Sequence, residues 1–440
     1  MNGVVRLAQD FPSFGEADWQ KAVRRARRLP EGSGGPDASA LPLYPPAKSA
    51  KPIAARECSP WRVVQRIDAD AIGVVAASLA DDFAGGASGV EIAFAGSPHP
   101  VSSRLPPGSL AELAAALPTL PGSFELRLDV DGALPAALLD VAAAGATTIV
   151  VARDPIAALA RGAPSPDALP LRRQAAEFDA RRIPGSVAIA DGRIWHASGA
   201  TDEQELAVAL ATYVELLRLT DTTGRISIAL AADIDQFRTI AKFRAARLLL
   251  ARIAELAMLG GEVPAIHAET AWRMMTTLSP ETNVVRAAIA AFGAVVGGAD
   301  SIAVLPFDVA SGANSTSARR LARNTQLILA HETGLPRVAD PGAGSGAIEA
   351  MTARMAESAW RRFQSIEKLG GIVAAIGEGG LLRDVTAARL ARAAGLANGD
   401  TKMIGVNVYR EDGQAPSPQR NPTPDRAPHL VPLRTAAAFE

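Results

Sequence analysis

The chain has 440 residues, of which 48% are hydrophobic and 21% are charged, an ordinary globular composition. This length is too great for one small core and is sufficient for a barrel of about 250 to 350 residues with extensions. The formal net charge of -1 provides no overall field that would attract nucleic acid or an anionic membrane, so we expect neither as a partner.

The single cysteine, Cys58, can form neither an internal disulfide nor a multi-cysteine metal site. The first residues, "MNGVVRLAQDFPSF", lack the charged start and apolar run of a secretion signal. Arginine and glutamate interrupt the alanine-rich stretches before they reach the about 20 residues of a membrane span. These features predict a soluble cytoplasmic protein.

Three regions follow one another along the chain. Residues 1–50 combine a charged, helix-like stretch with a loop-like stretch and contain too few apolar residues for a core, which predicts an N-terminal arm. Residues 51–405 are expected to form the folded domain. Residues 406–440 are rich in proline and polar residues, which predicts an irregular C-terminal tail that runs over a surface.

Within the central region, short apolar runs of strand length alternate with longer runs of helical period. The expected strands are 89–95, 124–130, 147–152, 186–190, 225–232, 263–268, 301–307 and 336–340. The expected helices are about 108–117, 132–144, 154–161, 202–219, 235–258, 281–296, 316–333 and 348–369.

The helical predictions depend on the spacing of apolar residues. In 235–258 the residues Ile240, Phe243, Ala246, Leu250, Ile253 and Ala257 recur at steps of three and four and fall on one face. The segment 316–333 repeats this stripe. It then meets Gly334, a natural C-cap, and Pro336, which prevents continuation of the helix.

Strands that alternate with helices favour parallel pairing, because each crossover helix covers the sheet. Eight such units predict an α/β fold in which the strands close into a (β/α)8 TIM-type barrel. A doubly wound open sheet is the alternative, since the sequence alone does not prove closure.

Chemistry in such a barrel lies at the carboxyl ends of the strands. His267 and Glu269 stand two residues apart at one strand end, so both side chains can face the same side. There His267 could donate to a substrate carbonyl or act as a general acid. The alternative is a structural histidine satisfied by its neighbours. These two residues are the candidate catalytic pair.

Further mouth positions are candidates for substrate binding. Thr270 follows the same strand, and Asp340, Gly344 and Ser345 accompany the glycine-rich loop "PGAGSGA" after the expected eighth strand. The glycines allow close approach of backbone to a phosphate, but the loop matches neither GxxxxGK[ST] nor GxGxxG. A tight barrel turn is the alternative interpretation.

Several catalytic patterns are absent from the text. There are no histidines with zinc spacing and no GxSxG elbow, and no DxHxxG occurs. We therefore expect no metal site in this chain.

A resemblance to a known family then emerges from ordered blocks. The blocks are "IAKFRAARLL", "NVVRAAIAAFGAVVGGADSIAVLPFD", "ARNTQLILAHETGLPRVADPGAGSGAIEAMT", "FQSIEKLGGIVAAI" and "MIGVNVY". In this order they resemble the methylmalonyl-CoA mutase family, densely from about 225 to 410 and more thinly back to "PWRVVQRID" (60–68).

The resemblance implies a (β/α)8 barrel that holds an acyl-CoA, followed in the family by a flavodoxin-like domain that holds adenosylcobalamin. It implies a radical rearrangement that interconverts methylmalonyl-CoA and succinyl-CoA, in which the cofactor carries the difficult chemistry. Bacterial members often pair a catalytic subunit with a smaller, diverged one.

Several departures from the catalytic pattern are typical of the diverged subunit. We expect no flavodoxin-like cobalamin domain after the barrel, and "PWRVVQRIDADA" stands where the family has its tyrosine-bearing block. "AVLPFD" resembles the small-subunit pattern. His267 falls at the family's active-site histidine, but Glu269 replaces a glutamine and Trp272 stands where a smaller residue is usual. His267 is thus expected to be a remnant.

The resemblance predicts the small subunit of a heterodimeric adenosylcobalamin-dependent methylmalonyl-CoA mutase. We expect it to stabilise a catalytic large subunit, which would bind the cofactor, while this chain alone holds none. One alternative is the catalytic barrel of a split mutase that works with a separate cobalamin-binding chain. Another is a non-catalytic protein that binds acyl-CoA.

Overall fold

The computed structural model describes residues 59–99, 103–117, 123–130, 132–145, 147–222, 224–411 and 430–440, with 17, 18, 21, 22, 25 and 53 as isolated residues. Nearly all of the predicted arm at 1–50 lies outside these residues, as does 412–429 of the predicted tail.

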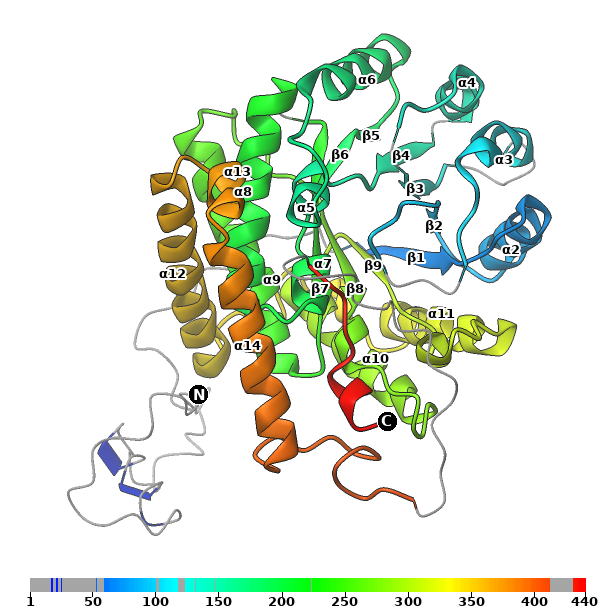
Figure 1. The fold of residues 1–440 in the computed structure, drawn as a ribbon. Helices are drawn as coiled ribbons and strands as arrows, with labels where there is room; N and C mark the ends of the chain where they lie inside the picture. Colours follow the sequence, from blue (N-terminus) through cyan, green and yellow to red (C-terminus); the bar gives the residue numbers. More distant parts are fainter. Residues whose placement is uncertain are drawn as a thin grey trace, which may run out of the picture.

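One all-parallel sheet forms the centre of the molecule (Figure 1). Its strands are β1 (Arg62–Ile67), β2 (Gly89–Ala93), β3 (Glu125–Asp129), β4 (Thr148–Val151), β5 (Gly185–Ser186), β6 (Ala188–Asp191), β7 (Ile226–Ala232), β8 (Ile266–Thr270) and β9 (Ser301–Ala303). Their order in the sheet is β5-β4-β3-β2-β1-β9-β8-β7-β6.

The sheet closes into a barrel through one interrupted strand. Only Val187 separates β5, which pairs with β4, from β6, which pairs with β7. The Val187 amide donates to the Arg225 carbonyl at 2.8 Å, and the Ile189 amide donates to the Arg153 carbonyl at 3.0 Å, so both sides of the interruption are bonded. The predicted TIM-type barrel is confirmed, and the open-sheet alternative is wrong.

The strand predicted at 336–340 is wrong. That segment contains the 3-10 turn Leu335–Arg337, and β1 takes the eighth place in the barrel, between β2 and β9. The sequence pattern missed β1 because Gln65 and Arg66 interrupt its apolar run. Both find partners from distant parts of the chain: Gln65 Nε2 donates to the Arg319 carbonyl at 3.1 Å, and Arg66 reaches Glu269.

Helices surround the barrel (Figure 1). Between the strands run α2 (Ile72–Ala84), α3 (Leu110–Ala116), α4 (Ala136–Gly145), α5 (Pro155–Ala160), α6 (Ala168–Arg181), α7 (Arg193–Ala197), α8 (Asp202–Thr220), α9 (Gln236–Leu256) and α10 (Thr282–Gly297), and α11 (Thr316–His331) follows the last strand, β9. After the barrel come α12 (Gly346–Lys368), α13 (Ile372–Gly377) and α14 (Gly380–Ala397).

Local signals start the helices near the site. Thr201 and Gln204 form a reciprocal capping box at α8, and Asp235 and Ser315 cap α9 and α11 through their side chains. α9 buries the predicted stripe from Ile240 to Ile253, whereas Ala257, predicted as its last member, is the exposed C-cap. Leu250 is fully inaccessible, and burial of such a side chain stabilises by about 1.5–3 kcal/mol. α12 packs outside α8 and α9 as an additional layer.

The last described residues return to the carboxyl ends of the strands. The Leu433 amide donates to the Ala197 carbonyl at 2.9 Å, and Glu440 accepts from the amides of Thr277 and Leu278 at 2.6 and 3.2 Å. Among the described helices, none is both long and apolar enough to cross a lipid bilayer.

Candidate functional site

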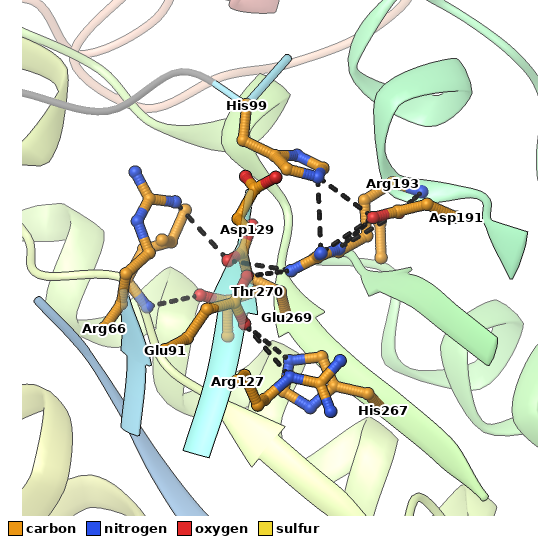
Figure 2. Close-up of polar contacts among 12 residues, drawn as sticks. Arg66, Glu91, His99, Arg127, Asp129, Asp191, Arg193, His267, Glu269 and Thr270 are labelled. Atoms are coloured by element: carbon orange, nitrogen blue, oxygen red, sulfur yellow. Dashed lines mark hydrogen bonds and ion pairs between the residues drawn. The ribbon is translucent and has the colours of Figure 1, made fainter. Parts of the chain in front are cut away.

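Charged side chains fill the middle of the barrel. Glu91 on β2, Arg127 on the neighbouring strand β3 and His267 on β8, three places from β2 in the sheet, point inward, and each is at most 3% exposed. Alternation along a strand sends every second side chain inward, so the apolar neighbours of these residues pack against the outer helices. Figure 2 shows the inward group converging near the axis.

Arg193 is the centre of this group. It begins α7 directly after β6, and its guanidinium lies across the barrel (Figure 2). Nη1 donates to Glu91 Oε1 at 3.0 Å and to Glu269 Oε2 at 3.3 Å, and Nη2 donates to Asp191 Oδ2 at 2.7 Å. Arg193 thus bonds carboxylates from three strands.

Two more arginines complete the charge balance. Arg127 Nε donates to Glu91 Oε2 at 3.3 Å, and Arg66 Nη1 donates to Glu269 Oε2 at 3.4 Å. Burial alone would raise the pKa of Glu91, but Arg193, with His267 and Arg127, holds that pKa well below its usual range. Glu91 is therefore an anion bonded on several sides. We call Arg66, Glu91, Arg127, Asp191, Arg193, His267 and Glu269 the axial network.

His267 is the predicted catalytic histidine, and it is a buried, neutral member of the axial network. Its Nδ1 lies 2.8 Å from Ser301 Oγ and its Nε2 lies 3.4 Å from Glu91 Oε2. Burial, with the positive charge of Arg127, lowers its pKa to about 3. At neutral pH the imidazole therefore has no extra proton to give as a general acid.

The remaining residues of this strand end have separate roles. His267 and Glu269 both face the barrel interior, as the two-residue spacing predicts. Thr270 is fully buried, and its hydroxyl accepts from the Leu305 amide at 2.8 Å, which joins the end of β8 to the segment after β9. The Thr270 hydroxyl is thus engaged in a hydrogen bond with the protein backbone.

The structure places the glycine loop away from the barrel mouth. No strand precedes it, and Asp340 pairs instead with Arg244 in the middle of the outer helix α9 and accepts from the Ile53 amide at 2.8 Å. The Gly344 amide donates to Glu349 at 3.2 Å, and Ser345 precedes α12 without a capping bond from its side chain. The predicted grouping of Asp340, Gly344 and Ser345 at a strand end is wrong.

Sequence reasoning missed most of the axial network. Its members Glu91, Arg127 and Asp191 are charged residues inside strands, and Arg193 follows a strand. A usable signal was present, because "GVEIA" and "ELRLD" place a charge between apolar residues at a period of two. In a strand covered by helices on its outer face, such a charge must face the barrel interior.

A second buried cluster lies at the start of α8. His196, Asp202 and Glu205 bring one ligand-type atom each within 4.8 Å of one another. Lys242 from α9 already lies among them, with Nζ 2.9 Å from Asp202 Oδ1 and 2.5 Å from Glu205 Oε2. The ammonium supplies the positive charge that these carboxylates need, so the arrangement does not call for a metal ion.

Two cavities lie at opposite ends of the barrel. One, of about 400 Å³, opens at the amino ends of the strands and is lined by small polar residues such as Ser186, Ser227 and Ser301, with Arg127 and His267 at its inner limit. The other, of about 810 Å³, lies beside the carboxyl ends of β7 and β8. Two members of the axial network, Arg193 and Glu269, line neither cavity.

Comparison with known proteins gives a consistent result. The family model described as methylmalonyl-CoA mutase matches residues 159–429. A Mycobacterium tuberculosis protein named probable methylmalonyl-CoA mutase small subunit is 40% identical over 324 residues, covering 69% of this chain and 50% of that protein.

Two further relatives carry the same kind of name. The methylmalonyl-CoA mutase small subunit of Streptomyces virginiae is 41% identical over 275 residues, covering 59% of this chain and 44% of its own length. That of Propionibacterium freudenreichii subsp. shermanii is 38% identical over 271 residues, covering 58% and 42%. The chain thus spans about half the length of these curated relatives.

Proposed function

Because the chain belongs to the methylmalonyl-CoA mutase family, we propose that it acts as a small subunit of an adenosylcobalamin-dependent methylmalonyl-CoA mutase. In this role it stabilises a catalytic large subunit as its heterodimer partner and does not itself catalyse. The observation that carries the proposal is the axial network, which fills the part of the barrel where a substrate would have to lie.

The energetics of the axial network support a structural role. Charges this deeply buried are retained only when they are paired, and removal of one partner leaves an uncompensated charge at a cost of about 3–5 kcal/mol. A substrate that entered along the axis would have to separate Arg193 from Glu91 and Glu269, which lie 3.0 and 3.3 Å away. The filled axis therefore favours a supporting barrel.

The candidate catalytic residues fit this proposal as remnants. His267 is neutral at physiological pH and is bonded to Ser301, and Glu269 is shared by Arg66 and Arg193. His267 lacks the extra proton that a general acid needs, and Glu269 lacks a free geometry because two arginines hold it. Substitution of His267 should accordingly leave the activity of a complex unchanged.

The described residues do not fit a cobalt ligand. His99, His196 and His267 are each at most 4% exposed, which leaves no access for a corrin ring, and His331 stands on the outer helix α11. We therefore assign adenosylcobalamin to the partner subunit and derive no step through it in this chain.

One observation favours a second candidate, a non-catalytic protein that binds an acyl-CoA. The cavity of about 400 Å³ at the amino ends of the strands has His267 in its lining, together with charged residues and the hydroxyl groups of Thr148, Ser186, Ser227 and Ser301. A narrow polar chain fits such a cavity without disturbing Arg193. The third alternative, a catalytic barrel that works with a separate cobalamin chain, is disfavoured by the filled axis.

Co-expression with a full-length mutase subunit tests the proposal. We expect a one-to-one complex by mass, with a mutase rate higher than that of the large subunit alone and unchanged by His267→Ala in this chain. Loss of activity with His267→Ala, in a complex that still assembles, would favour the catalytic alternative. Failure to form any complex, together with saturable binding of succinyl-CoA to the isolated chain, would favour the CoA-binding alternative.

A further inference from the structure

The larger cavity has a lining that the proposed subunit role does not explain. It lies between the start of α8, α9 and α10 and the end of α14, with the segment 401–404 closing one side. Its volume of about 810 Å³ lies within the range typical of pockets for small molecules. Figure 1 shows α14 running along this side of the barrel, between α12 and α10 in the view.

Part of the charge in this lining is internally balanced. Asp233 pairs with Arg273 at 2.7 Å, and Asp202 pairs with Arg238 at 2.8 Å and with Lys242. Asp235 accepts from the Arg238 amide as the cap of α9. Every carboxylate in the lining is thus already bonded to a donor of this chain.

Three cations of the lining have no carboxylate of the described residues within ion-pair distance, although Asp202 and Asp233 act on Arg392, and Glu440 on Arg286, from farther away. Arg286, Arg392 and Lys402 line the cavity, and none forms an ion pair with any residue that the structure describes. Arg286 is 8% exposed and bonds only neutral groups, among them the Ile404 carbonyl at 2.7 Å. Arg392 donates to the Gly199 carbonyl at 3.1 Å.

The positive charge here is costly in the absence of an anion. Burial, with the nearby charge of Arg273, lowers the pKa of Arg392 to about 10, and burial lowers the pKa of Arg286. A pKa lowered in this way means that the charged form is destabilised. A negative group placed between these side chains would remove that penalty and gain charge-assisted hydrogen bonds.

The rest of the lining is apolar and partly exposed. Val285 is 61% exposed, Ile404 is 48% exposed and Ile234 is 41% exposed, and all three border the cavity beside Met274 and Met403. Burying such side chains against a ligand is favourable in proportion to the area removed from water. The cavity therefore combines unpaired cations with an apolar wall.

We propose that this cavity binds a small organic anion. A carboxylate or phosphate group contacts Arg286, Arg392 and Lys402, and its aliphatic body lies against Met274, Val285 and Ile404. The site stands apart from the axial network and does not depend on the subunit role, since no axial residue lines it.

Calorimetric titration of the full chain tests the site with four probes, three of which carry a six-carbon chain. Hexyl phosphate and hexanoate carry both features, inorganic phosphate carries only the charge, and hexanol carries only the apolar body. We expect saturable one-to-one binding of at least one of the two hexyl anions, with inorganic phosphate and hexanol much weaker. The hexyl anion that binds more tightly identifies the preferred head group.

Two variants and a control connect the binding to the residues. Arg392→Gln and Lys402→Gln should each lower the affinity for the hexyl anion by about tenfold, because charge-assisted hydrogen bonds are roughly twice as strong as neutral ones. Arg383→Gln, on the exposed face of the same helix α14, should leave it unchanged. Lys402 is exposed, so its variant remains informative if Arg392→Gln folds poorly.

Three results would overturn the proposal. The first is no saturable binding of either hexyl anion. The second is an affinity for hexanol or for inorganic phosphate equal to that for the hexyl anions, which would mean that the charge or the apolar wall does not contribute to binding. The third is unchanged affinity in both Arg392→Gln and Lys402→Gln. None of these results bears on whether the chain pairs with a large subunit.

Discussion

Replacement of Arg193 by methionine removes the cation that joins the axial network. In the folded protein, Arg193 lies 2.7 Å from Asp191, 3.0 Å from Glu91 and 3.3 Å from Glu269, and all four side chains are at most 7% exposed. Methionine has a comparable volume but no charge. At pH 7.5 we expect a loss of about 3–5 kcal/mol in the free energy of unfolding, the usual cost of leaving buried charges without their partner.

The loss should depend on pH in a defined direction. In the wild type, Arg193 holds the pKa of Glu91 and of Asp191 below the usual range, so their contribution to stability is present above the unfolded pKa and is lost only as pH falls through the folded values. In Arg193→Met both pKa values rise above those of the unfolded chain. The variant then binds protons on folding, so its stability rises as pH falls. Its deficit in the free energy of unfolding relative to the wild type should therefore shrink between pH 7.5 and pH 5.5.

Urea denaturation followed by tryptophan fluorescence measures this deficit at the two pH values. Arg252→Met is the matched control, because Arg252 is half exposed on α9 and pairs only with Glu255, a contact worth about 0–1 kcal/mol. The reasoning would be refuted if Arg193→Met cost no more than Arg252→Met at pH 7.5, or if its deficit grew on acidification.

Three further substitutions give separate predictions. Lys242→Ala should lower the thermal midpoint of the chain at neutral pH. Added Zn²⁺ should raise the midpoint of this variant but not that of the wild type, because His196, Asp202 and Glu205 then offer ligand atoms within 4.8 Å of one another without a competing ammonium. A variant midpoint that Zn²⁺ leaves unchanged would contradict this. Thr270→Val should cost about 1–3 kcal/mol in urea denaturation, since it orphans the Leu305 amide, and should leave the mutase rate of a complex unchanged. Gly185→Ala should sharply lower the thermal midpoint, because the new Cβ would lie 1.8 Å from the Ile149 carbonyl oxygen; a midpoint near that of the wild type would exclude this clash.

Local signals in the sequence were sufficient for most of the architecture. The helices at 202–219, 235–258, 281–296 and 316–333 were predicted near their observed bounds because apolar spacing and capping residues act within a few turns. Alternation of strands and helices correctly favoured parallel pairing and a barrel. The strand predicted at 336–340 was wrong because a short apolar run beside Gly334 and Pro336 fits a turn equally well.

The sequence by itself determined the helices, the class of fold and the resemblance to a family, since these depend on patterns between near neighbours or on sequence motifs in a fixed order. Only the tertiary structure decided what fills the barrel. From the sequence alone, Arg66 is expected to be exposed. Closure of the sheet brings it within 3.4 Å of Glu269, which lies 203 positions away in the chain. A buried charge is stable only beside its partner, and for these residues the partners meet only when the ring of strands closes.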